Sequence, residues 1–547
     1  MLFDIVIVGG GIAGFSAALE AANRGSKVAI ISKGNFFRSN SALASGGINA
    51  ALGNEEEDSA ENHISDTLKG SAGLGDKKAA KIMCEQALQS IDKLEYLGAN
   101  FDKKDNKIAQ RPFGGAGKKR TCYVADKTGG AIVQTYMRNL KGHENLTFIS
   151  DYMLLNIIKY KDEIAGITVL NKKDSTTNVI ATKSLILATG GYAGIYHGYN
   201  TNTPDSTGDG IAVALRAGLE VKNCEFVQFH PTGFAKSGQL VSEAARGEGG
   251  FLVNEKEERF TDELQTRDKL ARAIAEEIKN GHKVYIDLRH LEPELIEKKL
   301  PSLQKSALMQ GGVDITKELL EIKPVAHYCM GGIPVNSKCQ SELKGVYACG
   351  EVAYTGAHGA NRLGGNSLLE ADVFGAIAGR EASAYSSKRD YYPIDYELVA
   401  KDMNLVEHII NGENLYNITS IKKNLGRTMY ENVGIFRTED TLLRGFDYIK
   451  YLRRLTVNLH CTIKEREFNM ELPAILELRN MLLVAEATTM SALKREESRG
   501  SHYRIDYPEM SDKFAAPSGI KELRDGYLKI EFEKGGVLTA IRKFLKN

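Results

Sequence analysis

A glycine-rich turn between an apolar strand and a helix constrains this chain more than any other sequence feature. Phe3–Val8 is a short, β-branched apolar run that predicts a buried parallel strand. It leads directly into Gly9-x-Gly11-x-x-Gly14, and the Ala-rich segment Ser16–Asn23 that follows is helical in character. Lys27–Ile31 is a second apolar run and completes a βαβ unit. This order of elements predicts a dinucleotide-binding domain.

The three glycines have different roles in such a turn. The first permits the tight turn, the second lets a pyrophosphate approach the backbone, and the third allows close packing of helix on strand. The helix N-terminus then offers free N–H groups and a positive dipole end to the phosphates. Where an acidic residue usually holds the ribose, the second strand ends at Ser32 and Lys33, which departs from the usual NAD pattern.

Two later strands also end in glycines. Ser184–Ala188 runs into Thr189-Gly190-Gly191, and Gly345–Ala348 runs into Cys349-Gly350-Glu351. The long interval between them predicts an insertion with its own helix, Asp268–Asn280, and strand, Lys283–Leu288. We therefore expect an α/β fold in four parts. They are a Rossmann-like dinucleotide-binding domain (1–225 and 341–388), an inserted α+β domain (226–340), a helical domain (389–505) and a short C-terminal region (506–547).

The last third of the chain has helical periodicity. Ile475, Leu478, Leu482 and Ala485 repeat at the spacing of one helix face, and Arg499-Gly500 is the expected end of that helix. Tyr527–Phe532 alternates in polarity and predicts a half-exposed strand.

Composition excludes several function classes. A net charge of +1 over 547 residues gives no electrostatic case for nucleic acid or an anionic membrane surface. The seven cysteines contain no C-x-x-C pair, so we expect no metal or iron–sulfur site and a reduced, cytoplasmic protein. No apolar run approaches the length of a membrane-spanning helix, so any contact with a membrane must run through partners.

Further motifs follow one another in order along most of the chain. They are Arg38-Ser39-Asn40-Ser41, Ala44-Ser45-Gly46-Gly47, Arg111–Gly115, Ala125–Gly129, Thr207–Gly210, Phe229–Gly233, Glu243–Gly250, Arg267-Asp268, His327–Gly332, His358–Arg362 and Glu497–Gly500. This series resembles the succinate dehydrogenase/fumarate reductase flavoprotein family, of which L-aspartate oxidase is a near relative. The resemblance implies that FAD is the cofactor and that substrate lies between the FAD-binding and capping domains.

The resemblance also assigns the cofactor-binding positions. They are Gly9, Gly11, Gly14, Ser32, Lys33, Ser39, Asn40, Ser41, Gly46, Gly47, Ala188, Thr189, Gly190, Asp209, Glu351, Asn366, Ser367 and Leu368.

For the substrate, the resemblance implies a small dicarboxylate clamped at both ends. His230 and Ser242, with Glu243, fall where the family contacts one carboxylate, and His327 and Arg362 fall where it contacts the other. Pairing both charges makes physical sense, because an unpaired buried charge is very costly. Reduction of fumarate needs a hydride at one central carbon and a proton at the other. By resemblance, Arg267 is the acid, and Glu243 and Arg246 form the proton relay that serves it.

Without the family, simpler interpretations apply. A single histidine such as His230 is more often a hydrogen-bonded structural residue than a ligand. Arg246 and Arg267 would usually be surface ion-pair partners of little energetic value. His358 is equally consistent with a residue that holds the Asn361–Arg362 loop, and its role stays open.

Two departures from the family pattern bear on the subtype. Many members attach FAD covalently to a histidine where this chain has Asn40, so we expect non-covalent FAD. A lower flavin potential would follow, which favours fumarate reduction over succinate oxidation. L-Aspartate oxidase must also neutralise a substrate ammonium, and Phe113 offers no carboxylate for it.

The two branches differ in their partners. We expect a fumarate reductase flavoprotein subunit that receives electrons from an iron–sulfur subunit and, through it, lies against a membrane anchor at the inner face of the cell membrane. The alternatives are an L-aspartate oxidase that acts alone and a non-enzymatic flavin-binding scaffold.

Overall fold

The computed structural model describes residues 1–522 and 526–532. Its largest sheet has seven strands within these ranges. Five are parallel to one another: β8 (Leu146–Ser150), β2 (Val28–Ser32), β1 (Leu2–Val8), β11 (Thr176–Leu187) and β18 (Val346–Ala348). The antiparallel strands β10 (Glu163–Asn171) and β9 (Tyr152–Tyr160) extend the sheet beside the first half of β11. The predicted βαβ unit and the later parallel strands are confirmed.

The register of the parallel strands brings their carboxyl ends to one edge. Val8 lies opposite Ile31 on one side and Leu187 on the other, and Leu187 lies opposite Ala348. The residues that follow each strand therefore meet at one place. In an open parallel sheet, this edge is where ligands bind.

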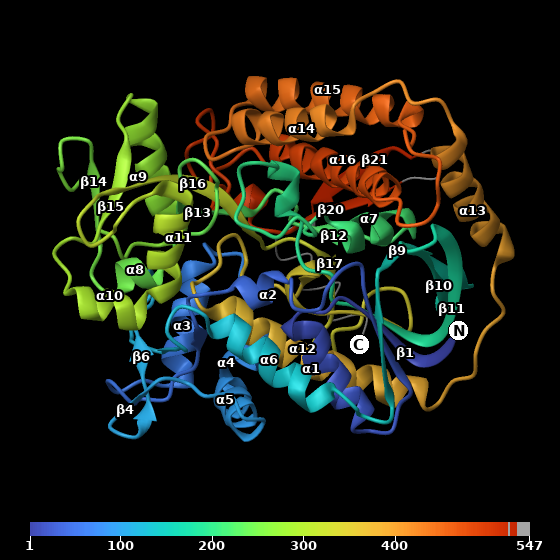
Figure 1. Cartoon of the computed structure of the whole chain (residues 1–547), viewed down its shortest axis with the longest axis horizontal. Coiled ribbons are helices and arrows are strands. Elements are labelled where there is room, and N and C mark those ends of the chain that lie inside the picture. The colour runs from blue at the N-terminus through green and yellow to red at the C-terminus, as the bar shows by residue number, and fades with distance from the viewer. Residues whose placement is uncertain (523–525, 533–547) are drawn as a thin grey trace.

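Two helices cross closely under this edge. α1 (Ile12–Ala22) packs against α12 (Asn366–Ser386), as Figure 1 shows in blue and gold. A Cβ at Gly375 would lie 2.5 Å from Ala13 O, and one at Gly379 would lie 2.2 Å from Ala17 O. A side chain at either position would clash with the backbone of α1, so only glycine allows the two helices to pack this closely.

The inserted segment forms a separate lobe, drawn in green at the left of Figure 1. Its antiparallel sheet has the order β13 (Val227–Phe234), β16 (Leu320–Cys329), β15 (Val284–Asp287) and β14 (Phe251–Asn254). Its helices are α8 (Ala244–Gly247), α9 (Arg267–Lys279), α10 (Pro293–Lys299) and α11 (Pro301–Gly311). The lobe has its own hydrophobic core, which includes Leu252, Leu270, Ile286 and Leu320. The predicted helix and strand of the insertion are confirmed by α9 and β15.

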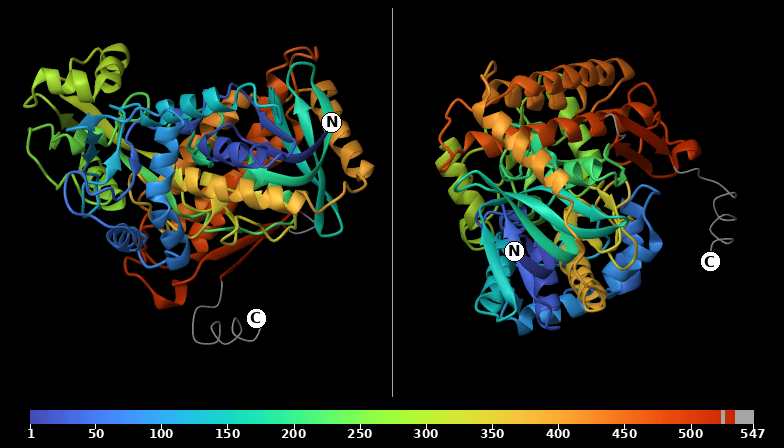
Figure 2. Two further views of the ribbon diagram at one scale, coloured as in Figure 1. Left: turned by 90° about the horizontal axis from the view of Figure 1, so that it is seen from below. Right: turned by 90° about the vertical axis from the view of Figure 1, so that its right-hand side faces the viewer.

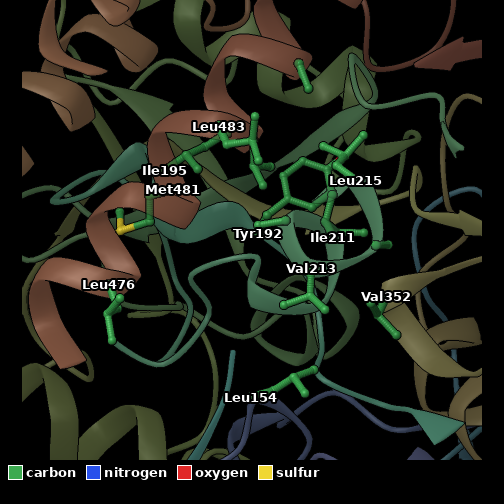
Figure 3. Close-up of a cluster of buried hydrophobic side chains, with 14 of the residues drawn as sticks. Leu154, Tyr192, Ile195, Ile211, Val213, Leu215, Val352, Leu476, Met481 and Leu483 are labelled. Atoms are coloured by element: carbon green, nitrogen blue, oxygen red, sulfur yellow. The ribbon is translucent and has the colours of Figure 1, made fainter. Parts of the chain in front are cut away.

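The helical region covers the other side of the FAD-binding domain (Figures 1 and 2). It comprises α13 (Tyr396–Asn411), α14 (Ile418–Asn432), α15 (Glu439–Leu455) and α16 (Glu471–Lys494). Figure 3 shows Leu483 of α16 near Tyr192, and Leu476 and Met481 of the same helix belong to the same cluster. Because these side chains belong to one hydrophobic cluster, the helices share a core with the first domain.

The predicted end of α16 at Arg499-Gly500 is wrong, because the helix ends at Lys494. The next residue, Arg495, is fully buried and donates to Glu225 Oε1 (2.5 Å), Glu497 Oε1 (2.9 Å) and Phe514 O (2.7 Å). Gly500 has a φ of +54° and serves a later turn in which Arg499 N donates to His502 O (2.7 Å). Gly500 therefore does not cap α16.

The predicted strand Tyr527–Phe532 is present as β21 (Leu528–Phe532), which pairs with β20 (Ser518–Glu522), and β20 pairs with β12 (Val221–Lys222). The end of the described chain is thus attached to the segment that immediately precedes the insertion. The other helices are α2 (Asn40–Leu43), α3 (Ala60–Gly70), α4 (Lys77–Glu85), α5 (Ala87–Tyr96), α6 (Thr128–Leu140) and α7 (Asp209–Arg216). The short strands are β3 (Ile48–Asn49), β4 (Lys103–Lys104), β5 (Lys107–Ile108), β6 (Gln110–Arg111), β7 (Thr121–Cys122), β17 (Ile333–Pro334) and β19 (Ala353–Tyr354).

Candidate active site

The glycine-rich turn between β1 and α1 is closely packed. Gly9 has a φ of +123°, and a Cβ there would lie 2.0 Å from Ala188 O. A Cβ at Gly14 would lie 2.1 Å from Gly9 O. Gly11 caps α1 without a side-chain hydrogen bond, so most N–H groups of the first helical turn stay free for an anion.

A cavity of about 710 Å³ begins at this turn and runs to the capping lobe, where Ser242 and His327 line its far end. It is lined by most of the predicted cofactor positions: Gly9, Gly11, Ser32, Lys33, Ser39, Asn40, Ser41, Ala188, Thr189, Gly190, Asp209, Glu351, Ser367 and Leu368. An elongated cavity with a bare helix N-terminus at one end fits a dinucleotide such as FAD.

Four predicted cofactor positions lie behind the cavity wall. Gly14 packs α1 on β1, and a Cβ at Gly46 would lie 2.6 Å from the Phe113 ring. Gly47 faces Thr121 in the same way, and Asn366 bonds to Asn49 and His63. These residues shape the wall from outside.

Lys33, at the end of β2, is held by two acidic side chains. Its Nζ donates to Asp209 Oδ2 (2.8 Å) and Glu477 Oε1 (2.9 Å). Burial alone would lower the pKa of Lys33, but these carboxylates raise it above its usual value. The two predicted cofactor residues Lys33 and Asp209 therefore contact each other, and they tie this edge of the sheet to α16.

The side chain of Asn40 is bonded throughout to the polypeptide. Its Nδ2 donates to Asn202 Oδ1 and to Ser206 Oγ, both at 2.8 Å. Its Oδ1 accepts from Thr203 N at 2.9 Å. An amide meets these needs for two donors and one acceptor, so Asn40 serves here to fix the 202–206 loop at the cavity wall.

Arg267 and Glu243 form a buried pair in the inserted lobe, although neither side chain lines the cavity. Arg267 Nε donates to Glu243 Oε2 (2.9 Å), and Nη2 donates to the same oxygen (2.5 Å). The other Glu243 oxygen accepts from Gly114 N (2.9 Å) and lies 3.8 Å from Arg246 Nη2. Burial alone would raise the pKa of Glu243, but Arg267 and Arg246 lower it to about 2, so it is ionised. Arg246 and Arg267 are thus buried charges and not surface ion-pair partners.

Arg362 lies beside this pair and is bridged to it by Gln228. Gln228 Oε1 accepts from Arg267 Nη1 (3.1 Å) and from Arg362 Nη2 (3.2 Å). Arg362 Nε is buried and has no hydrogen-bond partner among the described residues. Burial first, then repulsion from Arg267, lowers the pKa of Arg362 to about 10. A desolvated guanidinium without a carboxylate of its own favours binding of an anion.

The two predicted substrate histidines face each other across 5.0 Å between ring centroids. His327 Nδ1 pairs with Thr201 Oγ1 (2.6 Å), and His230 Nδ1 lies 3.0 Å from Thr232 O. Burial, followed by nearby arginines, holds the pKa of His230 well below its usual value. Burial, then His230 and Arg267, does the same for the pKa of His327. Both rings are therefore neutral near pH 7.

Ser242 and Phe113 complete the predicted set. Ser242 lines the cavity, and its Oγ accepts from Ala244 N (3.2 Å) at the start of α8. Phe113 is buried outside the cavity lining, between Gly46 and Gly364. It contributes to the site indirectly, because the backbone just after it positions Glu243 through Gly114.

The structure thus brings the predicted charged residues together and adds two that the sequence did not single out. Gln228 connects Arg267 to Arg362, and Thr201 orients His327. Glutamine and threonine are so common that a single sequence does not identify these two as site residues. A usable signal was the spacing, because Gln228 precedes His230 by two residues and so shares its face of β13.

Glu351 lines the same cavity near the nucleotide end. Burial raises the pKa of this carboxyl to about 7, although Cys329 N donates to its Oε1 at 3.0 Å. Within residues 1–522 and 526–532, no cluster of three or more His, Cys, Asp or Glu side chains has the arrangement of a metal site. In the same ranges, no helix is both long and apolar enough to traverse a bilayer.

Comparisons with known proteins agree with this geometry. A family model described as "FAD binding domain" matches residues 4–368, and one described as "Fumarate reductase flavoprotein C-term" matches residues 422–537. An uncharacterized FAD-dependent oxidoreductase of Methanocaldococcus jannaschii is 39% identical, over 97% of this chain and 98% of its own length. The succinate dehydrogenase flavoprotein subunit of Rickettsia bellii is 38% identical, over 93% of this chain and 91% of its own length.

A solved structure shows the same architecture. A variant of FrdA from the quinol fumarate reductase of E. coli superposes with a TM-score of 0.94 at 32% sequence identity. The match covers 98% of this chain and 97% of that one. The overall fold, including the inserted lobe and the helical layer, is therefore shared along the whole length.

Proposed function

The chain belongs to the succinate dehydrogenase and fumarate reductase flavoprotein family and is an FAD-dependent oxidoreductase, and we propose that it interconverts fumarate and succinate, with fumarate reduction favoured. One observation carries the choice of substrate. Three buried guanidinium groups, those of Arg246, Arg267 and Arg362, surround one ionised carboxylate, Glu243. The excess of two positive charges matches a dicarboxylate dianion.

In this proposal, the chain binds the substrate at both ends. Arg362, with its unpaired Nε, and His327 hold one carboxylate, and His230 and Ser242 hold the other. Because both histidines are neutral, they donate hydrogen bonds without adding to the charge. Clamping both ends fixes the central carbons, which is the proximity effect on which catalysis depends.

Bound FAD would supply the two-electron chemistry, in a cavity whose walls include Gly9, Asn40 and Glu351. The proton would come from Arg267, whose Nη1 is shared with Gln228 and whose Nε and Nη2 face Glu243. Arginine rarely gives up a proton, so a return path is required. The contacts of Glu243 with both Arg267 and Arg246 support it as that path.

The direction and the attachment of FAD are inferred from Asn40. An amide forms no covalent flavin bond, and its three hydrogen bonds to the 202–206 loop give it a different role. Non-covalent flavin has a lower potential than the attached form, so donation of electrons to fumarate is favoured.

We also propose that the chain is a subunit and receives electrons from an iron–sulfur partner. The similar Rickettsia bellii protein is named a subunit of succinate dehydrogenase, and the similar E. coli structure is named as part of a quinol fumarate reductase. Through that partner, the protein would reach a membrane anchor.

The test uses the purified full-length chain with FAD, reduced viologen and fumarate. We expect oxidation of the viologen with formation of succinate, and FAD released to the supernatant by acid precipitation. Conversion of aspartate to ammonia without any fumarate reduction would overturn the proposed substrate and favour an L-aspartate oxidase. Flavin that stays with the pellet would contradict non-covalent attachment.

A further inference from the structure

A buried carboxylate on α12, Glu370, collects three hydrogen bonds next to the substrate site. It accepts from Tyr328 Oη (2.7 Å), Thr355 Oγ1 (2.7 Å) and His358 Nε2 (2.9 Å). Tyr328 follows His327 in β16, whereas His358 lies in the loop that leads to Arg362. One side chain thus ties together the two segments that carry the clamp for one substrate carboxylate.

The donors and acceptors in this network have fixed directions. Burial alone would raise the pKa of Glu370, but His358, Thr355 and Tyr328 lower it, so the group is ionised and only accepts. Tyr328 must then donate its hydroxyl hydrogen, and His358 must carry a hydrogen on Nε2. His358 Nδ1 is buried without a hydrogen-bond partner in the described structure, so Glu370 is the side chain that fixes the orientation of this ring.

The Tyr328 ring, held by this network, lies against the guanidinium of Arg362. The Arg362 guanidinium carbon lies 4.1 Å from the centre of the Tyr328 ring, and Tyr328 also lines the cavity. A cation over an aromatic face is attracted without the use of its N–H groups. The ring therefore fixes the plane of the guanidinium and leaves its donors available, which a direct carboxylate partner would not.

We propose that Glu370 and His358 are positioning residues that hold the Tyr328 ring and, through it, orient Arg362 for a substrate carboxylate. The identity of that substrate rests on the function proposed above. Positioning of the Tyr328 ring gives His358, whose role the sequence left open, a definite task.

The same helix offers a matched control. Asp372, two residues after Glu370, is an equally buried carboxylate that accepts from Tyr136 Oη, Ser90 Oγ (2.6 Å) and Lys93 Nζ (2.9 Å). These partners come from α6 and α5 and do not line the cavity. Tyr328→Phe and Tyr136→Phe therefore each delete one tyrosine–carboxylate hydrogen bond from α12, but only the first lies next to the site.

The experiment compares succinate affinity in the FAD-loaded protein, measured from the change in flavin absorbance, with KM and kcat for fumarate. We expect Tyr328→Phe and His358→Leu to raise the succinate Kd and the fumarate KM about tenfold, with kcat changed less than about threefold. His358→Gln keeps an N–H donor and should restore affinity to within about threefold of the wild type. Tyr136→Phe should lower Tm and leave both constants unchanged.

The proposal is overturned if Tyr328→Phe and His358→Leu bind succinate as tightly as Tyr136→Phe does, or if His358→Gln binds as weakly as His358→Leu. Should His358→Leu fail to fold, Tyr328→Phe with His358→Gln decides the question. A wild-type protein that holds FAD but binds no dicarboxylate would instead refute the proposed function.

Discussion

The two ends of the cavity recognise their ligands in different ways. The nucleotide end is built from backbone at one edge of a sheet, where the register of β1, β2, β11 and β18 brings glycines and short side chains together. The other end, at Ser242 and His327, adjoins polar and charged side chains from distant segments, such as Gln228 and Arg362, which are 134 residues apart. A site built from backbone groups can be specified by one short motif, whereas a site built from side chains of distant segments requires the whole fold.

The ends also differ in how their charges are balanced. At the nucleotide end, Lys33 is neutralised by Asp209 and Glu477. At the other end, Arg362 forms no ion pair with a carboxylate of residues 1–522 or 526–532, and burial, then repulsion from Arg267, lowers its pKa to about 10. The paired Lys33 stabilises the protein without its ligand, whereas the unpaired charge of Arg362 favours binding of an anion. The four predictions below test this contrast.

The largest expected effect is at Arg267. Arg267→Ala removes the proposed acid and one partner of Glu243, so kcat for fumarate reduction should fall about a thousandfold or more. FAD content should stay at the wild-type level, because Arg267 lies at the dicarboxylate end. Arg272→Ala, on the same helix and paired with Asp268 in a partly exposed position, is the control. A loss of FAD with Arg267→Ala would show that the two ends are not separable.

The next effect concerns the nucleotide end. Gly9→Ala places a methyl group 2.0 Å from Ala188 O, so the turn must shift and FAD affinity should fall about a hundredfold. Gly25→Ala is the control, because Gly25 also has a positive φ (+82°) but nothing lies within 4 Å of its Cβ. Flavin content after gel filtration measures both. Equal losses in the two variants would mean that backbone strain, and not the contact with Ala188, sets the effect.

A smaller effect is expected at Gln228, which only the tertiary structure identified. Gln228→Leu keeps the volume but leaves Arg267 Nη1 and Arg362 Nη2 without their shared acceptor, so KM for fumarate should rise about tenfold. FAD binding should not change. An unaltered KM would remove Gln228 from the clamp.

The smallest effect is an expected absence of change with pH. Because burial holds the pKa of His327 and of His230 well below 6.5, neither gains a proton as pH falls from 8 to 6. The profile of kcat/KM for fumarate over this range should keep its shape in His327→Gln, since it reports groups in the free enzyme. An inflection near pH 7 would belong to Glu351, with its pKa of about 7, and should vanish in Glu351→Gln. Loss of that inflection in His327→Gln would show that His327 titrates in this range and would refute the prediction that it stays neutral.

Sequence reasoning succeeded where a structure depends on neighbours in the chain. The βαβ unit, the inserted lobe and the strand at 527–532 are local patterns of polarity and glycine, and each is present. It failed at Arg499-Gly500, because the end of α16 is set by Arg495, which is pulled into a buried network with Glu225 from far along the chain. The roles of the individual site residues stay predictions, although the fold joins Arg267 to Arg362 through Gln228 and brings both close enough to His327 to lower its pKa.

By itself, the sequence determined the nucleotide turn, the layered α/β fold and the family, because glycine positions and apolar periodicity act through the local backbone. Only the tertiary structure decided which charges are paired. It gave Lys33 two carboxylates, left Arg362 without one, and set Glu370 behind Tyr328. Electrostatic balance depends on distance and burial, and a linear sequence contains neither.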